Sequence, residues 1–182
     1  MFLSAPHPMK SLRLLVLAVV FTASALAGDT PPSPAHRAAL ASLEDATGKI
    51  LQLADSFTEE QYAWSPMEGV ASVQGAIAHV AGSYYFIAGK LGVPPPAGLN
   101  RRELGKGADK AATIALFKAA LQHMQGAIRQ VPADRLGEEV ELFGAKVPLA
   151  RVLILAADHS HEHLGQLIAY ARMNRVVPPW SK

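Results

Sequence analysis

The sequence predicts an all-α protein built as a four-helix bundle, and three observations carry this prediction. Four stretches of about 20 residues repeat apolar residues at alternating spacings of three and four. Each stretch begins at a residue that favours a helix start and ends near a residue that stops one. No strand–glycine–helix unit of a nucleotide-binding α/β fold occurs. Half of the 182 residues are hydrophobic and 18% are charged, which supplies a core and excludes a disordered chain.

The first two helices follow from their caps and apolar stripes. Ser33-Pro34 is a capping residue followed by proline, and a stripe then runs to Phe57. Thr58 and Gln61 form a capping-box pair that predicts a short additional turn. Ser72 starts the second long helix, which Pro94-Pro95-Pro96 ends, and its stripe is Val73, Ile77, Val80, Tyr84, Ile87 and Leu91.

The third helix has the clearest apolar seam, and a short hairpin separates it from the fourth. Asp109 caps the third helix and Pro132 stops it. Residues 139–147 are too few for another long helix and are expected to pair around Phe143-Gly144. Pro148 then opens the last helix, and Asn174 is its expected C-terminal cap. The tail 176–180 is predicted to be non-helical, with Trp180 packed somewhere on the protein.

The N-terminus has the pattern of a secretory signal peptide. Lys10 and Arg13 precede the apolar run 14–21, and small residues then lead to Ala25-Leu26-Ala27. The alternative is an uncleaved membrane anchor, but the run is short beside the roughly 20 apolar residues that a bilayer requires. We therefore expect a signal peptide over 1–27, a linker over 28–32 and a bundle domain over 33–182. The mature protein would be periplasmic or secreted without a membrane anchor. Either Met1 or Met9 can serve as the start of its precursor.

Composition also limits the chemistry and the partners. The chain has no cysteine, which excludes disulfides, thiolate nucleophiles and cysteine-based metal sites. Cleavage after Ala27 would remove two basic residues and no acid, leaving 15 of each. A neutral chain without a cluster of lysine and arginine argues against nucleic acid as a partner.

The fourth helix places polar residues where its pattern calls for apolar ones. Its three-four seam is Leu149, Val152, Ala156, His159, His163, Gln166, Tyr170 and Met173. His159 and His163 are four residues apart, so they share one face at the separation that two imidazoles need to bind one ion. A buried imidazole without a partner costs about 1–3 kcal/mol, so these seam positions call for an explanation.

A structural explanation competes with metal binding for this histidine pair. A buried histidine often only donates a hydrogen bond to a carbonyl or a carboxylate, and a glutamine in a seam is often structural. His161 points away from the pair and is expected at the surface. Asp158 and Glu162 lie off the seam, where they would be surface groups or support a ligand, and neither is a convincing general base.

A third metal ligand would have to come from another helix. His79 is the best candidate, because it lies beside the main stripe of the second helix in a row with small neighbours. His36 and His123 are weaker candidates. A bundle gathers ligands from facing helices, and three imidazoles leave a position open for water, as in catalytic zinc sites.

Two parts of the chain resemble the DinB-like family. The first comprises residues 55–66, with Ser72-Val73 and Ala78-His79-Val80 after them, and the second is the stretch from His159 to Tyr170 with Val177-Pro178-Pro179-Trp180. The most specific feature is one histidine in the second helix with His-x-x-x-His-x-x-Gln in the fourth.

The resemblance implies an up-down-down-up bundle that holds a divalent ion, nickel or zinc, through His79, His159 and His163. It also implies a homodimer, and members of the family include thiol-dependent transferases and isomerases. The family name does not imply contact with DNA. Because the members are mostly cytoplasmic, the signal peptide puts a cytosolic thiol co-substrate in doubt.

Three functions remain open on the sequence. The first is a metal-dependent hydrolase or transferase of an unidentified small molecule, in which the ion lowers the pKa of water toward about 7 and Gln166 and Tyr84 position the substrate. The second is a non-catalytic module that binds a metal or a small ligand. The third is a helical dimer whose histidines only serve the core. Three histidines suit zinc, nickel, iron or copper.

Overall fold

The structure is a computed structural model that describes residues 32–181. The predicted signal peptide (1–27), the two candidate start residues and most of the predicted linker (28–32) lie outside the described residues.

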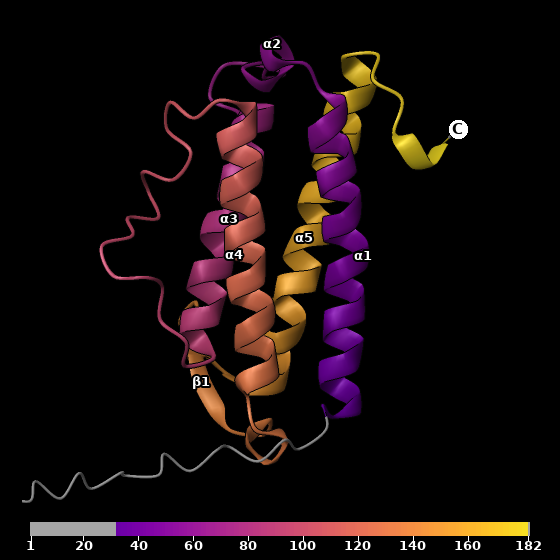
Figure 1. The fold of residues 1–182 in the computed structure, drawn as a ribbon. Helices are drawn as coiled ribbons and strands as arrows, with labels where there is room; N and C mark the ends of the chain where they lie inside the picture. The colour runs from indigo at the N-terminus through magenta and orange to yellow at the C-terminus, as the bar shows by residue number, and fades with distance from the viewer. Residues whose placement is uncertain (1–31, 182) are drawn as a thin grey trace, which may run out of the picture. The chain divides into compact units, whose positions relative to one another are not determined.

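Four long helices form the bundle, in the order α1 (Pro34–Ser56), α3 (Val73–Lys90), α4 (Lys110–Gln130) and α5 (Leu149–Met173). The short helix α2 (Glu59–Tyr62) links α1 to α3, and the 3-10 turn η1 (Ala133–Arg135) follows α4. Helices α3 and α4 run in the same direction, so residues 91–109 return along the outside of the bundle (Figure 1). This arrangement confirms the predicted up-down-down-up bundle.

The helix starts are where the capping residues predict them. Side chains at the N-caps accept hydrogen bonds from backbone N–H groups three residues ahead, and these caps are Ser33, Thr58, Ser72 and Asp109. The capping box of Thr58 and Gln61 is complete. Pro148 precedes α5 without a side-chain cap, and Asn174 ends that helix as predicted. Local sequence therefore dictates these boundaries.

The hairpin is also as predicted, whereas the C-terminal tail differs. Strands β1 (Glu139–Leu142) and β2 (Ala145–Pro148) pair antiparallel, with positive φ at Phe143 and Gly144 in the turn between them. The tail forms a 3-10 turn, η2 (Pro179–Ser181), against α1, and Trp180 stays 37% exposed. The tail is non-helical over 176–178 as predicted, whereas Pro179 and Trp180 belong to the 3-10 turn and Trp180 is only partly buried.

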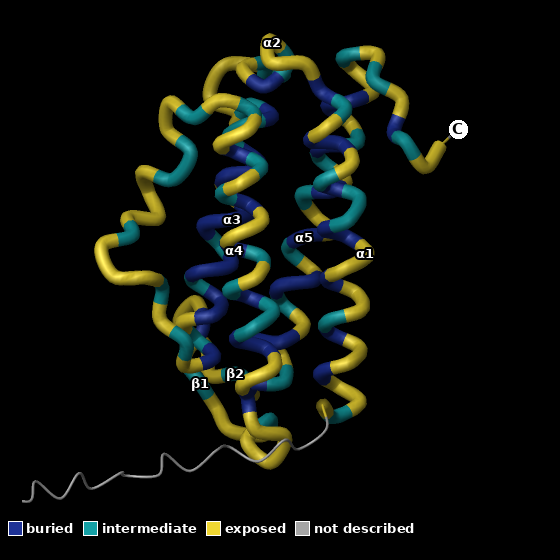
Figure 2. Tube along the Cα trace, viewed as in Figure 1, coloured by how far each residue is buried: buried dark blue, intermediate teal, exposed yellow. Residues whose placement is uncertain are grey.

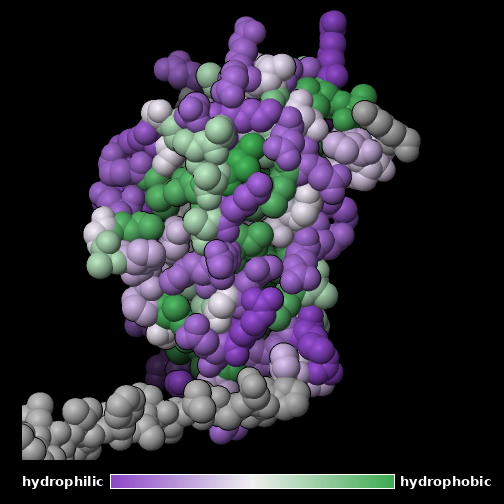
Figure 3. Space-filling view, in the orientation of Figure 1, coloured by the Kyte–Doolittle hydropathy of each residue, from purple (hydrophilic) through white to green (hydrophobic). Residues whose placement is uncertain are grey.

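Buried residues recur along all four long helices (Figure 2). The view in Figure 3 shows hydrophilic side chains over much of one face, with hydrophobic ones gathered in its upper half. Within the bundle, the predicted stripe of α3 is buried, with Val73, Ile77, Val80 and Tyr84 fully enclosed. Among residues 32–181, none of the helices combines the length and the apolar composition needed to span a bilayer.

The seam predicted for α5 requires a correction. The buried face of this helix is wider than one seam, because α5 packs against both α1 and α3. Its buried residues include Leu153, Ala157, Ser160, Leu164, Leu167 and Ala171, all of which the predicted seam left out. His159, His163 and Gln166 are half-buried at the margin facing α3, and Met173 is exposed. The interpretation that these polar residues replace core leucines was therefore wrong.

Candidate metal centre

The structure brings together His79 of α3 with His159 and His163 of α5. Each offers one ring nitrogen, and these nitrogens lie within 4.8 Å of one another. The ring centroid of His79 lies 5.1 Å from that of His159 and 4.8 Å from that of His163. The centroids of the two α5 rings are 4.5 Å apart. His79 is exposed and the other two are half-buried, so the cluster lies at the bundle surface.

A chain of hydrogen bonds orients His163. The carbonyl of Ala71 can only accept, so the Tyr170 hydroxyl donates to it (3.0 Å) and itself accepts from Gln166 Nε2 (2.7 Å). This orientation turns Gln166 Oε1 toward His163 Nδ1 at 2.7 Å, and that nitrogen must therefore carry the proton. Nε2 of His163 is left with a free lone pair, which is the form that binds a metal ion.

His159 also has a side-chain oxygen three residues further along the helix, at a distance longer than that of a hydrogen bond. The carboxylate of Glu162 lies 3.7 Å from His159 Nδ1, while the Ser83 hydroxyl of α3 lies 3.0 Å from Nε2. Each α5 histidine is thus followed, one helical turn later, by a side-chain oxygen near its Nδ1. Oxygens at Nδ1 are the usual outer partners of histidines that bind metals through Nε2.

The surroundings hold two of the rings in their neutral form. Partial burial, and then the neighbouring His163 and His79, lower the pKa of His159 to about 4, although Glu162 opposes this shift. Partial burial and His163 likewise lower the pKa of His79. A metal ligand must be unprotonated, so both shifts favour coordination near neutral pH.

The three side chains fit a divalent transition metal. Each offers an imidazole nitrogen within 4.8 Å of the other two, and such nitrogens are ligands that divalent transition metals prefer. The Ser83 hydroxyl is a short group that can rotate away from Nε2. Three imidazoles suit zinc and nickel, and the donor set alone does not separate these two ions.

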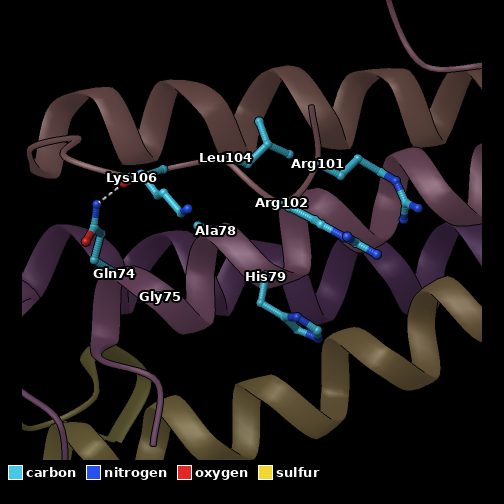
Figure 4. Close-up of a pocket in the computed structure, with 9 residues that line it drawn as sticks. Gln74, Gly75, Ala78, His79, Arg101, Arg102, Leu104 and Lys106 are labelled. Atoms are coloured by element: carbon cyan, nitrogen blue, oxygen red, sulfur yellow. Dashed lines mark hydrogen bonds between the residues drawn. The ribbon is translucent and has the colours of Figure 1, made fainter. Parts of the chain in front are cut away.

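A cavity of about 460 Å³ opens beside the cluster, between α3 and the loop 91–109 (Figure 4). His79 lines it together with residues of α3 and of the loop, including Gln74, Ala78, Arg101, Arg102 and Lys106. The candidate metal centre therefore adjoins a space of the size that small ligands occupy.

The two residues predicted to position a substrate lie differently. Gln166 is at the cluster, where both ends of its amide are engaged by His163 and Tyr170. Tyr84 is fully buried, its hydroxyl bonds to Ser160 at 2.7 Å, and its ring packs against Phe117. The structure does not bring Tyr84 to the cluster surface, so its contacts are those of a core residue.

The other histidines among residues 32–181 lie away from the cluster. His36 is 2% exposed and bonds to Ser33 and Val131, and His123 packs beside Tyr85. His161 is at the surface as expected, and its Nδ1 bonds to the carbonyl oxygen of Ala157, one helical turn earlier.

Asp158 and Glu162 were both predicted to be surface groups or to support a ligand. Asp158 is at the surface in an ion pair with Arg151, whereas Glu162 lies 3.7 Å from His159 Nδ1. The support that Tyr170 and Ser83 give to the cluster was missed. The i,i+3 spacing of His159 with Glu162 was the available signal, whereas Ser83 comes from another helix and gave none.

Comparisons with known proteins agree with this fold. The family model described as the DinB superfamily matches residues 42–167. The protein YjoA of Bacillus subtilis (strain 168) is 25% identical over 126 residues, which cover 66% of this chain and 79% of YjoA.

Three solved structures are similar to the bundle. The crystal structure of YjoA superposes with a TM-score of 0.60 at 21% identity, covering 77% of this chain and 93% of YjoA. A DinB-like protein from Bacillus cereus ATCC 10987 gives 0.67 at 16%, covering 79% and 95%. YfiT from Bacillus subtilis, described as a probable metal-dependent hydrolase with an unusual four-helix bundle topology, gives 0.62 at 18%, covering 82% and 93%. The match of the family model to most of the chain shows that this protein belongs to the DinB superfamily.

Proposed function

We propose that this protein is a metal-dependent hydrolase or transferase that holds one divalent ion, zinc or nickel, on His79, His159 and His163. The observation that carries the proposal is the convergence of these rings from two helices, with their nitrogens within 4.8 Å of one another. The description of YfiT, which shares the fold, as a probable metal-dependent hydrolase supports the same reading.

The residues around such a site would bind the ion and orient its histidine ligands. When bound, the ion would supply Lewis-acid chemistry, lowering the pKa of water and polarising a substrate carbonyl or phosphoryl group. Gln166 and Tyr170 hold the ring of His163, and Ser83 and Glu162 lie against His159. The side chain of Glu162 is 75% exposed at the edge of the cluster.

Metal content is the direct test. Purified protein should contain one zinc or nickel per chain by elemental analysis, and His159→Ala should contain none. His161→Ala is the matched control, since this histidine lies on the same helix but its ring bonds to the Ala157 carbonyl. Wild-type protein without a stoichiometric ion, or His159→Ala with undiminished metal uptake, would refute the site.

A non-catalytic binding module is the second candidate. It is favoured by the scarcity of acid–base groups at the cluster. Among residues 32–181, Glu162 is the one carboxylate paired with the three histidines, and it is largely exposed. A panel of ester, amide, phosphoester and thiol-transfer substrates separates the two candidates. Turnover that chelation abolishes and metal restores identifies an enzyme, and an inert panel favours binding.

Export and a homodimer are further parts of the proposal. The charged, apolar and small residues of positions 1–27 support export, and N-terminal sequencing of protein from the periplasm should begin at Gly28. The dimer rests on the family resemblance, and light scattering after gel filtration tests it. The substrate would be a small molecule, since the mature chain would carry 15 basic and 15 acidic residues and so lacks the net positive charge typical of proteins that bind nucleic acid.

A further inference from the structure

The cavity beside His79 has a basic wall. Arg101, Arg102 and Lys106 line it from the loop 91–109, and none of the carboxylates within residues 32–181 lines it. In Figure 4 these three side chains come from the loop, which forms one side of the cavity. Helix α3, which bears His79, forms the other side. An anion in this cavity would therefore lie next to one of the three candidate metal ligands.

The basic segment is fixed to α3 along successive helical turns. The Gln74 amide donates to the carbonyls of Gly105 and Ala108, the second at 2.8 Å. Gly105 has φ +75° and lies so close to α3 that a Cβ there would be 2.6 Å from the Cβ of Ala78. One turn further, a Cβ on Gly82 would lie 3.6 Å from the Arg101 carbonyl oxygen. The close fit means that the position of the cations is built into the fold.

The positive charge of this wall is not balanced locally. Arg102 has no ion-pair partner among residues 32–181. The Arg101 guanidinium lies 5.1 Å from the centre of the Phe86 ring, a cation–π contact that leaves its donors free. Lys106 pairs with Glu103, but both side chains are more than half exposed, so water screens the pair. An excess of cations in a recess concentrates anions there.

We propose that this cavity is the subsite for an oxyanion, a carboxylate or a phosphate, carried by the substrate. Arg101 and Arg102 would hold the group, since guanidinium forks bind both kinds of oxyanion in a bidentate way. The inference rests on the proposed function in one respect: the bound anion lies beside His79, so the substrate of the metal centre is an anionic small molecule.

The first arm of the test uses metal-free protein and needs no catalysis. Succinate and inorganic phosphate are titrated separately into wild-type protein, Arg101→Gln/Arg102→Gln and the control Arg129→Gln by calorimetry at low salt. Arg129 is an exposed arginine on α4, weakly paired with Glu44, so the control removes a similar charge elsewhere. Both cavity arginines are exposed, and circular dichroism checks that the double variant folds.

We expect wild-type protein to bind at least one anion, and the double variant to bind it about tenfold or more weakly, while Arg129→Gln matches wild type. Tighter binding of succinate identifies a carboxylate subsite, and tighter binding of phosphate identifies a phosphate subsite. Failure of wild-type protein to bind either anion, or equal binding by the double variant, overturns the proposal.

The second arm places the anion relative to the metal. Cobalt-loaded protein is titrated with butanohydroxamate and with succinic monohydroxamate, which carries a carboxylate in place of the methyl group, and the cobalt absorption band is recorded. We expect the charged compound to bind about tenfold more tightly, and the double variant to lose this preference while its cobalt content stays unchanged. Equal binding of both compounds by wild-type protein overturns the placement. If the protein takes up no cobalt, the proposed function fails, and the first arm still decides the anion subsite.

Discussion

His36 and the cluster of His79, His159 and His163 show two ways in which a helical bundle uses histidine. His36 is 2% exposed, with Nε2 donating to the Val131 carbonyl at 2.9 Å and Nδ1 accepting from Ser33 at 2.7 Å. Both of its nitrogens serve the protein, and it joins the start of α1 to the end of α4. In the cluster, His163 commits only Nδ1 to a neighbour and keeps Nε2 free. A histidine that is available for a ligand thus has one ring nitrogen without a hydrogen-bond partner in the fold.

The largest expected effect separates these two regions by metal binding. His163→Ala should lower the affinity for zinc by more than about a hundredfold, because one of three ligands is lost. His36→Ala should leave zinc affinity unchanged. Calorimetry on metal-free protein, in competition with a chelator, measures both. Equal zinc affinity of His163→Ala and wild type would erase the distinction.

The next effect concerns the support of His163. Gln166→Leu keeps a side chain of similar size but removes the acceptor at Nδ1, and it should weaken zinc binding about 10- to 100-fold. Tyr170→Phe acts one bond further away and should weaken binding less than Gln166→Leu does. The same titration measures both variants. A purely structural glutamine would lower the melting temperature without changing zinc affinity in folded protein.

A smaller effect is expected for stability at His36. His36→Ala leaves the buried Val131 carbonyl without a donor and should lower the free energy of unfolding by about 1–3 kcal/mol. His161→Ala, at the surface of α5, should change it by less than about 0.5 kcal/mol. Urea denaturation of the metal-free proteins measures both values. A similar loss in the two variants would show that burial of His36 contributes nothing.

A further effect is a pH dependence of the metal-free protein. The pKa of His159 is about 4 in the folded chain, below the 6.5 of an ordinary histidine, so the unfolded chain takes up a proton first as the pH falls. The contribution of His159 to stability is therefore complete above about pH 6.5 and declines as the pH falls toward 4.

His159→Gln should consequently lose less stability than wild type between pH 7 and pH 5. The carboxylates titrate in both proteins, so their contribution to the free energy of unfolding cancels in the difference. Urea denaturation at each pH measures that free energy. Parallel curves for the two proteins would contradict the lowered pKa.

Much of the fold could be predicted because its signals are local. Capping residues such as Ser72 and Asp109 mark the helix starts through bonds to their own next turn. The hairpin around Phe143-Gly144 was found in the same way. The seam of α5 could not be predicted, since its buried width depends on packing against two helices at once. That is why the histidines lie at the margin of the core instead of within it.

The candidate site divides along the same line. The i,i+4 pair of His159 and His163 is visible on a single helix, as is the support of each ring three residues later. The partnership with His79, and the contact of Ser83 with His159, span 76 or more positions and exist only because α3 packs against α5. The basic cavity likewise depends on Gly105 meeting Ala78. Helical period and caps act within a few residues, whereas contacts between helices are settled only when the whole core closes.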